Sequence, residues 1–460
     1  MRGQGGGMTG PAVIVIGAGL SGLAAAQALR QAGVQPLVIE ARDRPGGRVW
    51  TSRLWPDLPV DLGATWVHGA TANPLTTLAD QVGARRVETR YGSSVWLDRD
   101  GARLPKGARM RAPRMMLKAI RAEAEGAEAD MSIAEAARRS TVWRDAGEDQ
   151  RDMLRKWINT FIEHEYAADW ERLSIWYFDD DKDWKGPDVL FPDGFDRLLV
   201  PLLEGIPVRY GARVRSLSRA GRGVRIGLEG GAVLEAEQAI VTLPPSVLQA
   251  GAVDFGAALA PRRAQAIQTQ YAGVLNKCYL RFDGVFWPTG HDWVQWLGPQ
   301  PGLWAEWVDL AHVAGVPVML GFNAGAQGLA VEALDDRDTV AAAHEALRAI
   351  HGSSLPRPVG WQITRWGQDP FALGSYSSNP VGWRAKTRKA LAGADWDGAL
   401  FFAGEAASPC YFGTAHGAMR AGRKAARQII KLRKKAAVTR APPQGDGMGV
   451  DRAKASALTE

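Results

Sequence analysis

The segment from residue 13 to residue 40 constrains the fold of this chain more than any other. It opens with the apolar run Val13-Ile14-Val15-Ile16, which is typical of a buried parallel strand. The turn Gly17-Ala18-Gly19-Leu20-Ser21-Gly22 follows, then a helix of small residues and a second apolar strand that ends at Glu40. This order of strand, G-x-G-x-x-G turn, helix and acid predicts a Rossmann-like site for a dinucleotide.

Each glycine of the turn has a separate expected role. Gly17 permits the tight turn, Gly19 lets the backbone approach a pyrophosphate, and Gly22 lets the helix pack closely on the strand. Phosphates would lie at the helix N-terminus, where free N–H groups and the helix dipole favour negative charge. Glu40 stands where an acid accepts hydrogen bonds from a ribose. The alternative is a glycine-punctuated hydrophobic core segment without a ligand.

A second glycine pair follows the acid directly. Gly46 and Gly47 would let another loop approach the cofactor, and Arg48 offers a fork of donors to phosphates.

Composition narrows the class of protein. A chain of 460 residues predicts two domains, and 46% hydrophobic with 23% charged residues is ordinary for a globular protein. The two cysteines, Cys278 and Cys410, make no disulfide framework, so a cytoplasmic location is expected. The seven histidines include no H-x-x-x-H or H-E-x-x-H pattern, so no protein-bound metal is predicted.

The net charge of +7 invites a nucleic-acid interpretation, but the charge is local. Residues 420–440 carry nine basic residues and no acid. Cations at a helix C-terminus suit its dipole, so a solvated helix end is favoured over nucleic-acid or membrane attachment. The uncharged stretch 12–29 resembles an export signal or a membrane span, but its glycines match a phosphate-binding loop. Residues 1–10 are expected to form a flexible leader.

The pattern of elements predicts an α/β fold with a discontinuous Rossmann-like domain. We assign residues 9–75, 191–275 and 385–435 to the dinucleotide-binding domain. Residues 76–190, with a helical insertion, and 276–384 form a substrate domain of mixed sheet and helices. Helices are expected at 75–82, 112–127, 132–139 and 150–166, a meander at 208–236, and a strand at 276–287. Residues 436–460 are expected to be a disordered tail.

Three loops and termini carry candidate binding residues. Trp66 and His68 lie in a glycine-bounded loop, where they either face a ligand or pack. The acidic cluster 179–183 either attracts a cationic substrate or is a solvated loop. A late strand ends in the acid Glu405, and the helix that starts after Thr414 suits an electron-rich ring system at its N-terminus. Some of the 18 tryptophans are expected to wall an aromatic pocket.

These motifs, in this order, resemble the flavin-containing amine oxidase family, which includes polyamine oxidases, monoamine oxidases and lysine-specific histone demethylases. The resemblance covers about residues 13–430. The motifs that carry it are the 17–22 turn with Glu40, Gly46-Gly47-Arg48, residues 61–69, Asn276-Lys277, Trp366 through Gly374-Ser375-Tyr376-Ser377, and Phe402-Ala403-Gly404-Glu405 through Tyr411 and Gly417.

The resemblance implies FAD as cofactor and assigns residues to it. Glu40 and Arg48 would hold the adenosine ribose and the phosphate region, Val214 would meet adenine, and Glu405 would bind the ribityl chain. Thr414 and Ala415 would lie beside the flavin ring. Other positions implied to contact the cofactor are Gly17, Gly19, Gly22, Gly46, Gly47, Gly63, Ala64, Thr65, Trp366 and Gly404.

The resemblance also implies catalytic positions. Lys277 matches the lysine that reaches flavin N5 through a water, although an ordinary strand lysine is the alternative. Trp366, Tyr376 and Tyr411 match positions that wall the amine, and His68 matches a substrate-contacting residue. The coiled-coil insertion of the histone demethylases is absent, which argues against chromatin binding.

The function that follows is FAD-dependent oxidation of a primary or secondary amine to an imine, with hydride transfer to flavin N5 and reduction of O2 to hydrogen peroxide. The expected partners are a small-molecule amine and O2, with no nucleic acid or membrane, in a monomer or homodimer. An L-amino-acid oxidase or related flavin monooxygenase is one alternative. A desaturase-type or non-catalytic flavin protein is another.

Ser375 predicts that the flavin is bound without a covalent link. Family members with covalent FAD carry cysteine at this position, before the active-site tyrosine. Acid precipitation of the yellow protein should therefore leave the colour in the supernatant. Colour that stays with the pellet would contradict this prediction and would point to the nearby thiol of Cys410.

Overall fold

Residues 13–16, predicted to be a buried parallel strand, form an inner strand of a six-stranded sheet. The computed structural model describes residues 11–105, 108–384 and 386–440. The strand order is β22-β23-β13-β1-β2-β9, and β1 (Val13–Ile16) lies between β2 (Pro36–Ile39) and β13 (Gln238–Val241) in parallel register. The sheet is completed by β9 (Val208–Arg209), β22 (Gly393–Asp395) and β23 (Leu400–Phe402). The α/β class is confirmed.

Alternating side chains of β1 pack on opposite layers. Val13 and Val15 join a cluster with α1 (Leu20–Gln31) and α15 (Ala415–Arg440). Ile14 and Ile16 pack toward the meander of β10 (Val214–Ala220), β11 (Gly223–Leu228) and β12 (Val233–Ala236), which β14 (Asp254–Phe255) extends. Burial on both faces explains why β1 is apolar throughout.

The predicted meander is correct except at its start. Residues 208–210 were expected to open it, but β9 pairs in parallel with β2 instead, with Val38 opposite Val208. The N–H of Ala212 then donates to the Glu40 carbonyl. This short segment therefore hydrogen-bonds to β2 and to the residue after it, and the meander begins only at β10.

A second six-stranded sheet has the order β20-β16-β19-β18-β17-β7. Its strands are β7 (Ser94–Leu97), β16 (Leu275–Arg281), β17 (Trp293–Trp296), β18 (Glu306–Asp309), β19 (Val318–Ala324) and β20 (Gly360–Ile363). The strand predicted at 276–287 ends at Arg281, after which the chain turns away. The division of the chain into domains remains a prediction. A small sheet of β5 (Trp66–Val67), β8 (Asp188–Leu190) and β6 (Val87–Thr89) joins strands from both predicted domains.

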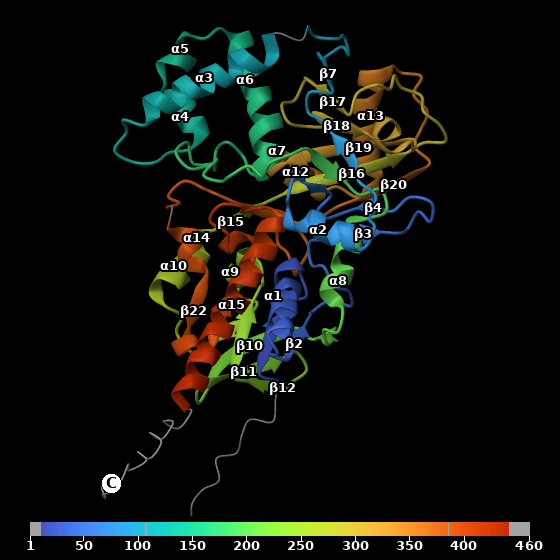
Figure 1. Ribbon diagram of the computed structural model, residues 1–460. Coiled ribbons are helices and arrows are strands. Elements are labelled where there is room, and N and C mark those ends of the chain that lie inside the picture. The colour runs from blue at the N-terminus through green and yellow to red at the C-terminus, as the bar shows by residue number, and fades with distance from the viewer. Residues whose placement is uncertain (1–10, 106–107, 385, 441–460) are drawn as a thin grey trace, which may run out of the picture.

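A group of helices lies beside the second sheet, at the upper left of Figure 1. They are α3 (Ala108–Ala124), α4 (Ile133–Arg139), α5 (Thr141–Asp145) and α6 (Glu148–Ile158). The single helix predicted at 150–166 is interrupted, because a π-helical turn (Asn159–Glu163) separates α6 from α7 (His164–Tyr166). Ser132 caps α4, since its hydroxyl accepts a hydrogen bond from the N–H of Glu135 at 3.1 Å.

Shorter elements connect these layers. The helices are α2 (Pro74–Gln81), α8 (Val200–Leu203), α9 (Pro245–Gln249), α10 (Pro261–Thr269), α11 (Leu310–Ala314), α12 (Gly325–Glu332), α13 (Asp336–His351) and α14 (Thr387–Leu391). The strands are β3 (Thr51–Ser52), β4 (Val60–Asp61), β5 (Trp66–Val67), β6 (Val87–Thr89), β8 (Asp188–Leu190), β15 (Tyr271–Gly273) and β21 (Tyr376–Ser378). Single 3-10 turns occur at Phe195–Leu199, Trp396–Gly398 and Glu405–Ala407.

The last helix is longer than predicted. The tail was expected to start at Ala436, but α15 continues to Arg440, because alanine, lysine and arginine favour a helix and no proline intervenes before Pro442. The remainder of the predicted tail, and the predicted leader, lie outside the described residues. Within the described part of the chain, no helix combines the length and the apolar character needed to cross a bilayer.

The packing of α15 against α1 depends on Gly422. A Cβ at this position would lie 1.9 Å from the carbonyl oxygen of Ser21, so the two backbones touch. Gly422→Ala should therefore force the helices apart and destabilise the fold by about 1–3 kcal/mol, the usual cost of overpacking. The measurement is the urea midpoint. Gly92→Ala is the control, because nothing lies within 4 Å of its Cβ position, and equal midpoints for the two variants would contradict the prediction.

Candidate active site

A cavity of about 320 Å³ runs from the glycine-rich turn to the second sheet, within the size range of small-molecule sites. It gathers most of the predicted site residues. Those that line it are Gly17, Gly19, Glu40, Gly46, Gly47, Arg48, Gly63, Ala64, Thr65, His68, Val214, Lys277, Trp366, Tyr376, Gly404, Glu405, Thr414 and Ala415. Two predicted residues, Gly22 and Tyr411, are not part of this lining.

The glycine-rich end has the features of a phosphate site. A Cβ on Gly22 would lie 1.9 Å from the Gly17 carbonyl oxygen, so this glycine serves close packing. Gly19 and Gly46 bring the two glycine loops together in a β-bridge. The hydroxyl of Ser21 lines the cavity at the start of α1 and is buried without a hydrogen-bond partner among the described residues. A buried orphan hydroxyl at a helix N-terminus suits an anionic ligand.

Glu40 is held in place by the backbone. Its Oε2 accepts from the N–H of Ala18 at 2.7 Å, and its Oε1 accepts from the N–H of Arg42 at 2.9 Å. Arg42 in turn forms a two-pronged ion pair with Asp369, with distances of 2.9 and 2.7 Å. The carboxylate is thus fixed between the glycine turn and the segment after β2.

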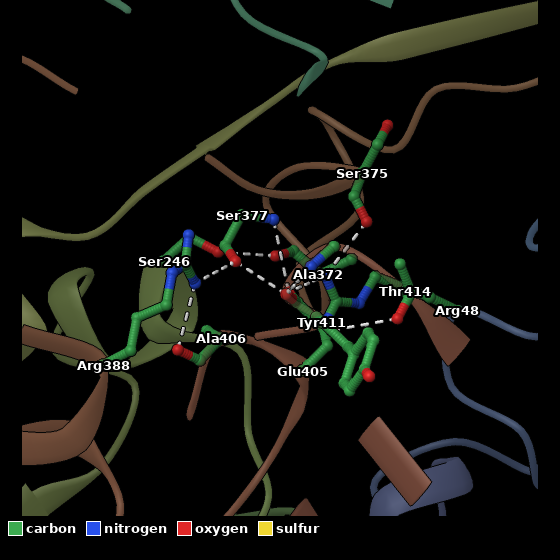
Figure 2. Close-up of polar contacts among 11 residues, drawn as sticks. Arg48, Ser246, Ala372, Ser375, Ser377, Arg388, Glu405, Ala406, Tyr411 and Thr414 are labelled. Carbon is green, nitrogen blue, oxygen red and sulfur yellow. Dashed lines mark hydrogen bonds and ion pairs between the residues drawn. The ribbon is translucent and has the colours of Figure 1, made fainter. Parts of the chain in front are cut away.

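Glu405 lies at the centre of a hydrogen-bond network (Figure 2). Arg48 donates to its Oε1 at 3.0 Å, the Ser377 hydroxyl donates to its Oε2 at 2.6 Å, and the Gly413 N–H donates to Oε2 at 2.8 Å. Burial alone would raise the pKa of Glu405, but Arg48, Ser377, Arg388 and Gly413 together hold that pKa below its ordinary value. Glu405 therefore remains a carboxylate in a buried position.

Arg388 also belongs to this network, although no sequence pattern predicts it. Its guanidinium is fully buried and donates to Ser377 Oγ at 2.8 Å, to Asn379 Oδ1 at 2.7 Å and to the Ala406 carbonyl at 3.1 Å. It also lies 3.8 Å from the centre of the Phe412 ring. Burial lowers the pKa of Arg388 to about 9, although the charges of nearby carboxylates act to raise it. Its local sequence is an ordinary charged helix without a motif.

Lys277 joins the second sheet to the loop after β4. Its ammonium donates to the carbonyl oxygens of Asp61 at 3.0 Å and Gly63 at 2.6 Å, and to the Thr65 hydroxyl. Tyr279, on the same strand face, donates to the Asp61 carbonyl at 2.8 Å. Burial lowers the pKa of Lys277, although the charge of the Asp61 carboxylate acts to raise it. Lys277 is thus a buried cavity residue that holds the 61–65 loop.

The predicted aromatic residues have different surroundings. The Trp366 indole N–H donates to the Leu62 carbonyl at 2.8 Å, and its ring meets Trp50 edge-on. The Tyr376 hydroxyl donates to the His164 carbonyl at 2.5 Å. Tyr411 instead packs against Trp184 and His416, under the guanidinium of Arg420. Of the three, Trp366 and Tyr376 face the cavity.

The end of the cavity next to the second sheet combines aromatic rings with carboxylates. Trp293 stacks on Tyr91 at 4.4 Å and on Trp66 at 5.6 Å between ring centres. Four acids line the same region, namely Glu165, Asp181, Asp188 and Glu306. Of these, only Asp181 lies in the predicted acidic cluster. The others were missed because no motif surrounds them and the tertiary fold alone brings them together.

His68 is paired with one of these acids. Its Nδ1 lies 3.1 Å from Asp188 Oδ2. Burial would lower the pKa of His68, but the hydrogen bond to Asp188 and the charge of Glu165 raise it above its ordinary value. Burial raises the pKa of Asp181 to about 7, and the negative charges of Glu165 and Asp183 contribute to this shift. In the described residues, no group of three or more His, Cys, Asp or Glu side chains is placed to hold a metal ion.

Comparison with known proteins decides the family. The model of the family described as flavin containing amine oxidoreductase matches residues 20–430. The chain belongs to this family. The expected family is confirmed, and with it FAD as the cofactor. The two glycine loops, the orphan hydroxyl of Ser21 and the fixed carboxylate of Glu40 fit that cofactor.

The relatives include histone demethylase homologs and polyamine oxidases. The chain is 33% identical to lysine-specific histone demethylase 1 homolog 3 of Oryza sativa subsp. indica, over 91% of this chain and 54% of that protein. It is 32% identical to polyamine oxidase 4 of Oryza sativa subsp. japonica, over 92% of this chain and 89% of that protein. The chain thus spans about half the length of the demethylase homologs and most of the polyamine oxidase.

A solved structure has the same fold. A redesigned variant of a putrescine oxidase superposes with a TM-score of 0.74 at 22% identity, covering 92% of this chain and 99% of that one. The expected fold, an FAD-binding α/β domain with mixed sheets and helices, is confirmed.

We predict that Lys277→Met leaves FAD bound but slows flavin reduction by amine, reoxidation by O2, or both, by about 10²-fold, the scale for one positioned proton-transfer group. Methionine keeps the bulk of the stem and removes all three donors. Stopped-flow traces of the two half-reactions measure the effect. Lys118→Met, at an exposed position on α3, is the control. Rates within a few-fold of the parent for both variants would place Lys277 away from the flavin.

Proposed function

We propose that the protein oxidises a primary or secondary amine with more than one cationic group, such as a diamine or polyamine, with FAD as acceptor. The observation that carries the proposal is the chemistry of the cavity beyond the flavin-binding residues. Carboxylates and stacked aromatic rings line that part together. Carboxylates attract ammonium groups, and ring faces hold them by cation–π attraction.

Bound FAD supplies the hydride acceptor, and O2 returns it to the oxidised state with release of hydrogen peroxide. The protein residues orient the amine and exclude water. Tyr376 and Trp366 are fixed by hydrogen bonds to backbone carbonyls, so their rings form a rigid wall. Rigid walls favour catalysis because they hold the reacting carbon in a productive orientation. The proposed catalytic set also contains His68, which is hydrogen-bonded to Asp188, and Lys277, which is predicted to lie beside the flavin.

The amino-acid oxidase alternative needs a guanidinium for the substrate carboxylate. The arginines that line the cavity within the described residues are Arg42, Arg48 and Arg213. Arg42 pairs with Asp369, Arg48 pairs with Glu405, and both Arg42 and Arg213 lie over the Phe371 ring, at the cofactor end. The substrate end offers carboxylates instead, which disfavours an anionic substrate. A desaturase-type or non-catalytic flavin protein would give no peroxide with any amine.

A panel of substrates under a peroxide assay tests the proposal. It should contain a diamine, the monoamine of equal chain length and the corresponding α-amino acid. We expect peroxide with the diamine, less with the monoamine and none with the amino acid. Turnover of the amino acid alone would favour the alternative, and no peroxide from any amine would reject the proposal.

Asp181 gives a pH-dependent prediction. Its pKa of about 7 means that the carboxylate gains its charge as pH rises through neutrality. The Kd of a diamine should therefore tighten between about pH 6 and pH 8, and Asp181→Asn should weaken binding at pH 8 by about 10-fold or more, the loss of one charged hydrogen bond. Asp179→Asn is the control, because Asp179 pairs with Arg121 at 2.8 Å. Identical Kd profiles for both variants would exclude Asp181 as a contact.

A further inference from the structure

A buried histidine–glutamate pair lies in the wall of the substrate end. His164 Nδ1 is 2.6 Å from Glu306 Oε2, and both side chains are at most 6% exposed. Gln295 donates to the other oxygen of Glu306 at 2.7 Å. Because these contacts fix Glu306 on both oxygens, the carboxylate orients the imidazole ring through Nδ1. Neither residue belongs to a motif of the sequence.

The second ring nitrogen of His164 has no hydrogen-bond partner among the described residues. Nε2 is buried, yet His164 lines the cavity. When the Nδ1 proton donates to Glu306, Nε2 carries a lone pair and is an acceptor. An unpartnered buried acceptor is costly and calls for a donor from a ligand. The donor that fits an acidic, aromatic cavity is the N–H of an ammonium group.

The sheet register places this pair close to the predicted flavin lysine. Glu306 on β18 is directly opposite Phe322 on β19, and Phe322 is directly opposite Lys277 on β16. Residues directly opposite one another point to the same face of a sheet, and all three line the cavity. Two strand spacings separate Glu306 from Lys277, roughly 10 Å, a distance that one small amine spans.

The local backbone supports a functional role for His164. The π-helical turn Asn159–Glu163 directly precedes it, and such turns occur often at functional sites. The His164 carbonyl accepts from the Tyr376 hydroxyl, so the residue is tied to the predicted flavin-facing wall. In Figure 1, α7 lies at the lower end of α6, next to the second sheet.

We propose that His164, oriented by Glu306, accepts the proton that the substrate ammonium must lose before oxidation. The N–H bond of the ammonium breaks, a new N–H bond forms at Nε2, and the amine nitrogen keeps the electron pair. Glu306 stabilises the resulting imidazolium, as a carboxylate does for a general-base histidine. This inference rests on the proposed amine oxidation and names one of its catalytic residues.

Other titratable groups surround the pair and enter any pH profile. They are Tyr376 on β21, Tyr91 after β6, Glu163 and Glu165 beside His164 in the chain, and His68 with Asp188. Glu163 is occupied by Arg155, Asn159 and the N–H of Trp170. A variant is therefore needed to assign a proton to His164.

His164→Asn tests the proposal, because asparagine retains a donor for Glu306 but removes the lone pair at Nε2. Anaerobic flavin reduction by a diamine and by a monoamine is followed over pH 7 to 9. At pH 7 the variant should be slower by about 10²–10⁴-fold with either substrate. Its rate should then rise about tenfold per pH unit, because only amine that arrives neutral reacts, and aliphatic amines titrate near pH 10.

His312→Gln is the matched control, since His312 pairs with Asp292 at 3.3 Å and is not part of the cavity lining. It should leave the pH profile unchanged. Equal rates for His164→Asn and the parent would overturn the proposal. A flavin-reduction rate that is lower by the same factor at every pH would overturn the proposal and leave His164 a structural role. Weaker binding of the diamine alone, with unchanged reduction rates, would also overturn it and would show that the pair binds an ammonium group. Failure of the parent to be reduced by any amine would instead reject the proposed function.

Discussion

The contact between Lys277 and the 61–65 loop is the interaction on which the site depends. A buried ammonium must find acceptors, because its desolvation is otherwise too costly. Here the three donors of the amine reach two carbonyls and one hydroxyl of a loop more than 200 residues away in the sequence. The contact fixes the second sheet against the cofactor end, and the cavity lies between them.

The same requirement explains the network around Glu405. A buried carboxylate persists only when donors surround it, and Arg48, Ser377 and Gly413 supply them. Arg388 in turn donates a hydrogen bond to the Ser377 hydroxyl oxygen. Each partner therefore positions the next, and Arg388 helps to stabilise a charge in the cofactor part of the cavity although it is not part of the cavity lining.

The sequence predicted the parts of the fold that local chemistry determines. The Gly17–Gly22 turn, Glu40 and the apolar strand β1 form one contiguous pattern, and their places followed from it. The acids Glu165 and Glu306 could not be found this way, since they come from a helix and a strand about 140 residues apart. Arg388 was missed because a buried arginine and a solvated one have the same local sequence. Tyr411, predicted to wall the amine, is not part of the cavity lining, because order along the chain does not fix which way a ring points.

The two ends of the cavity differ in how their charged groups are paired, and this difference bears on the proposed substrate. At the cofactor end, Arg42 and Arg48 line the cavity beside the glycine loops, where phosphate groups need cations. At the substrate end, Glu165, Asp181 and Glu306 line it instead. In the proposed reaction, a diamine with one nitrogen near Tyr376 would keep its other cation among these acids, which attract it. An amine that carries a carboxylate would gain no such match at the substrate end, so the charges there agree with the proposed diamine or polyamine and not with an amino acid.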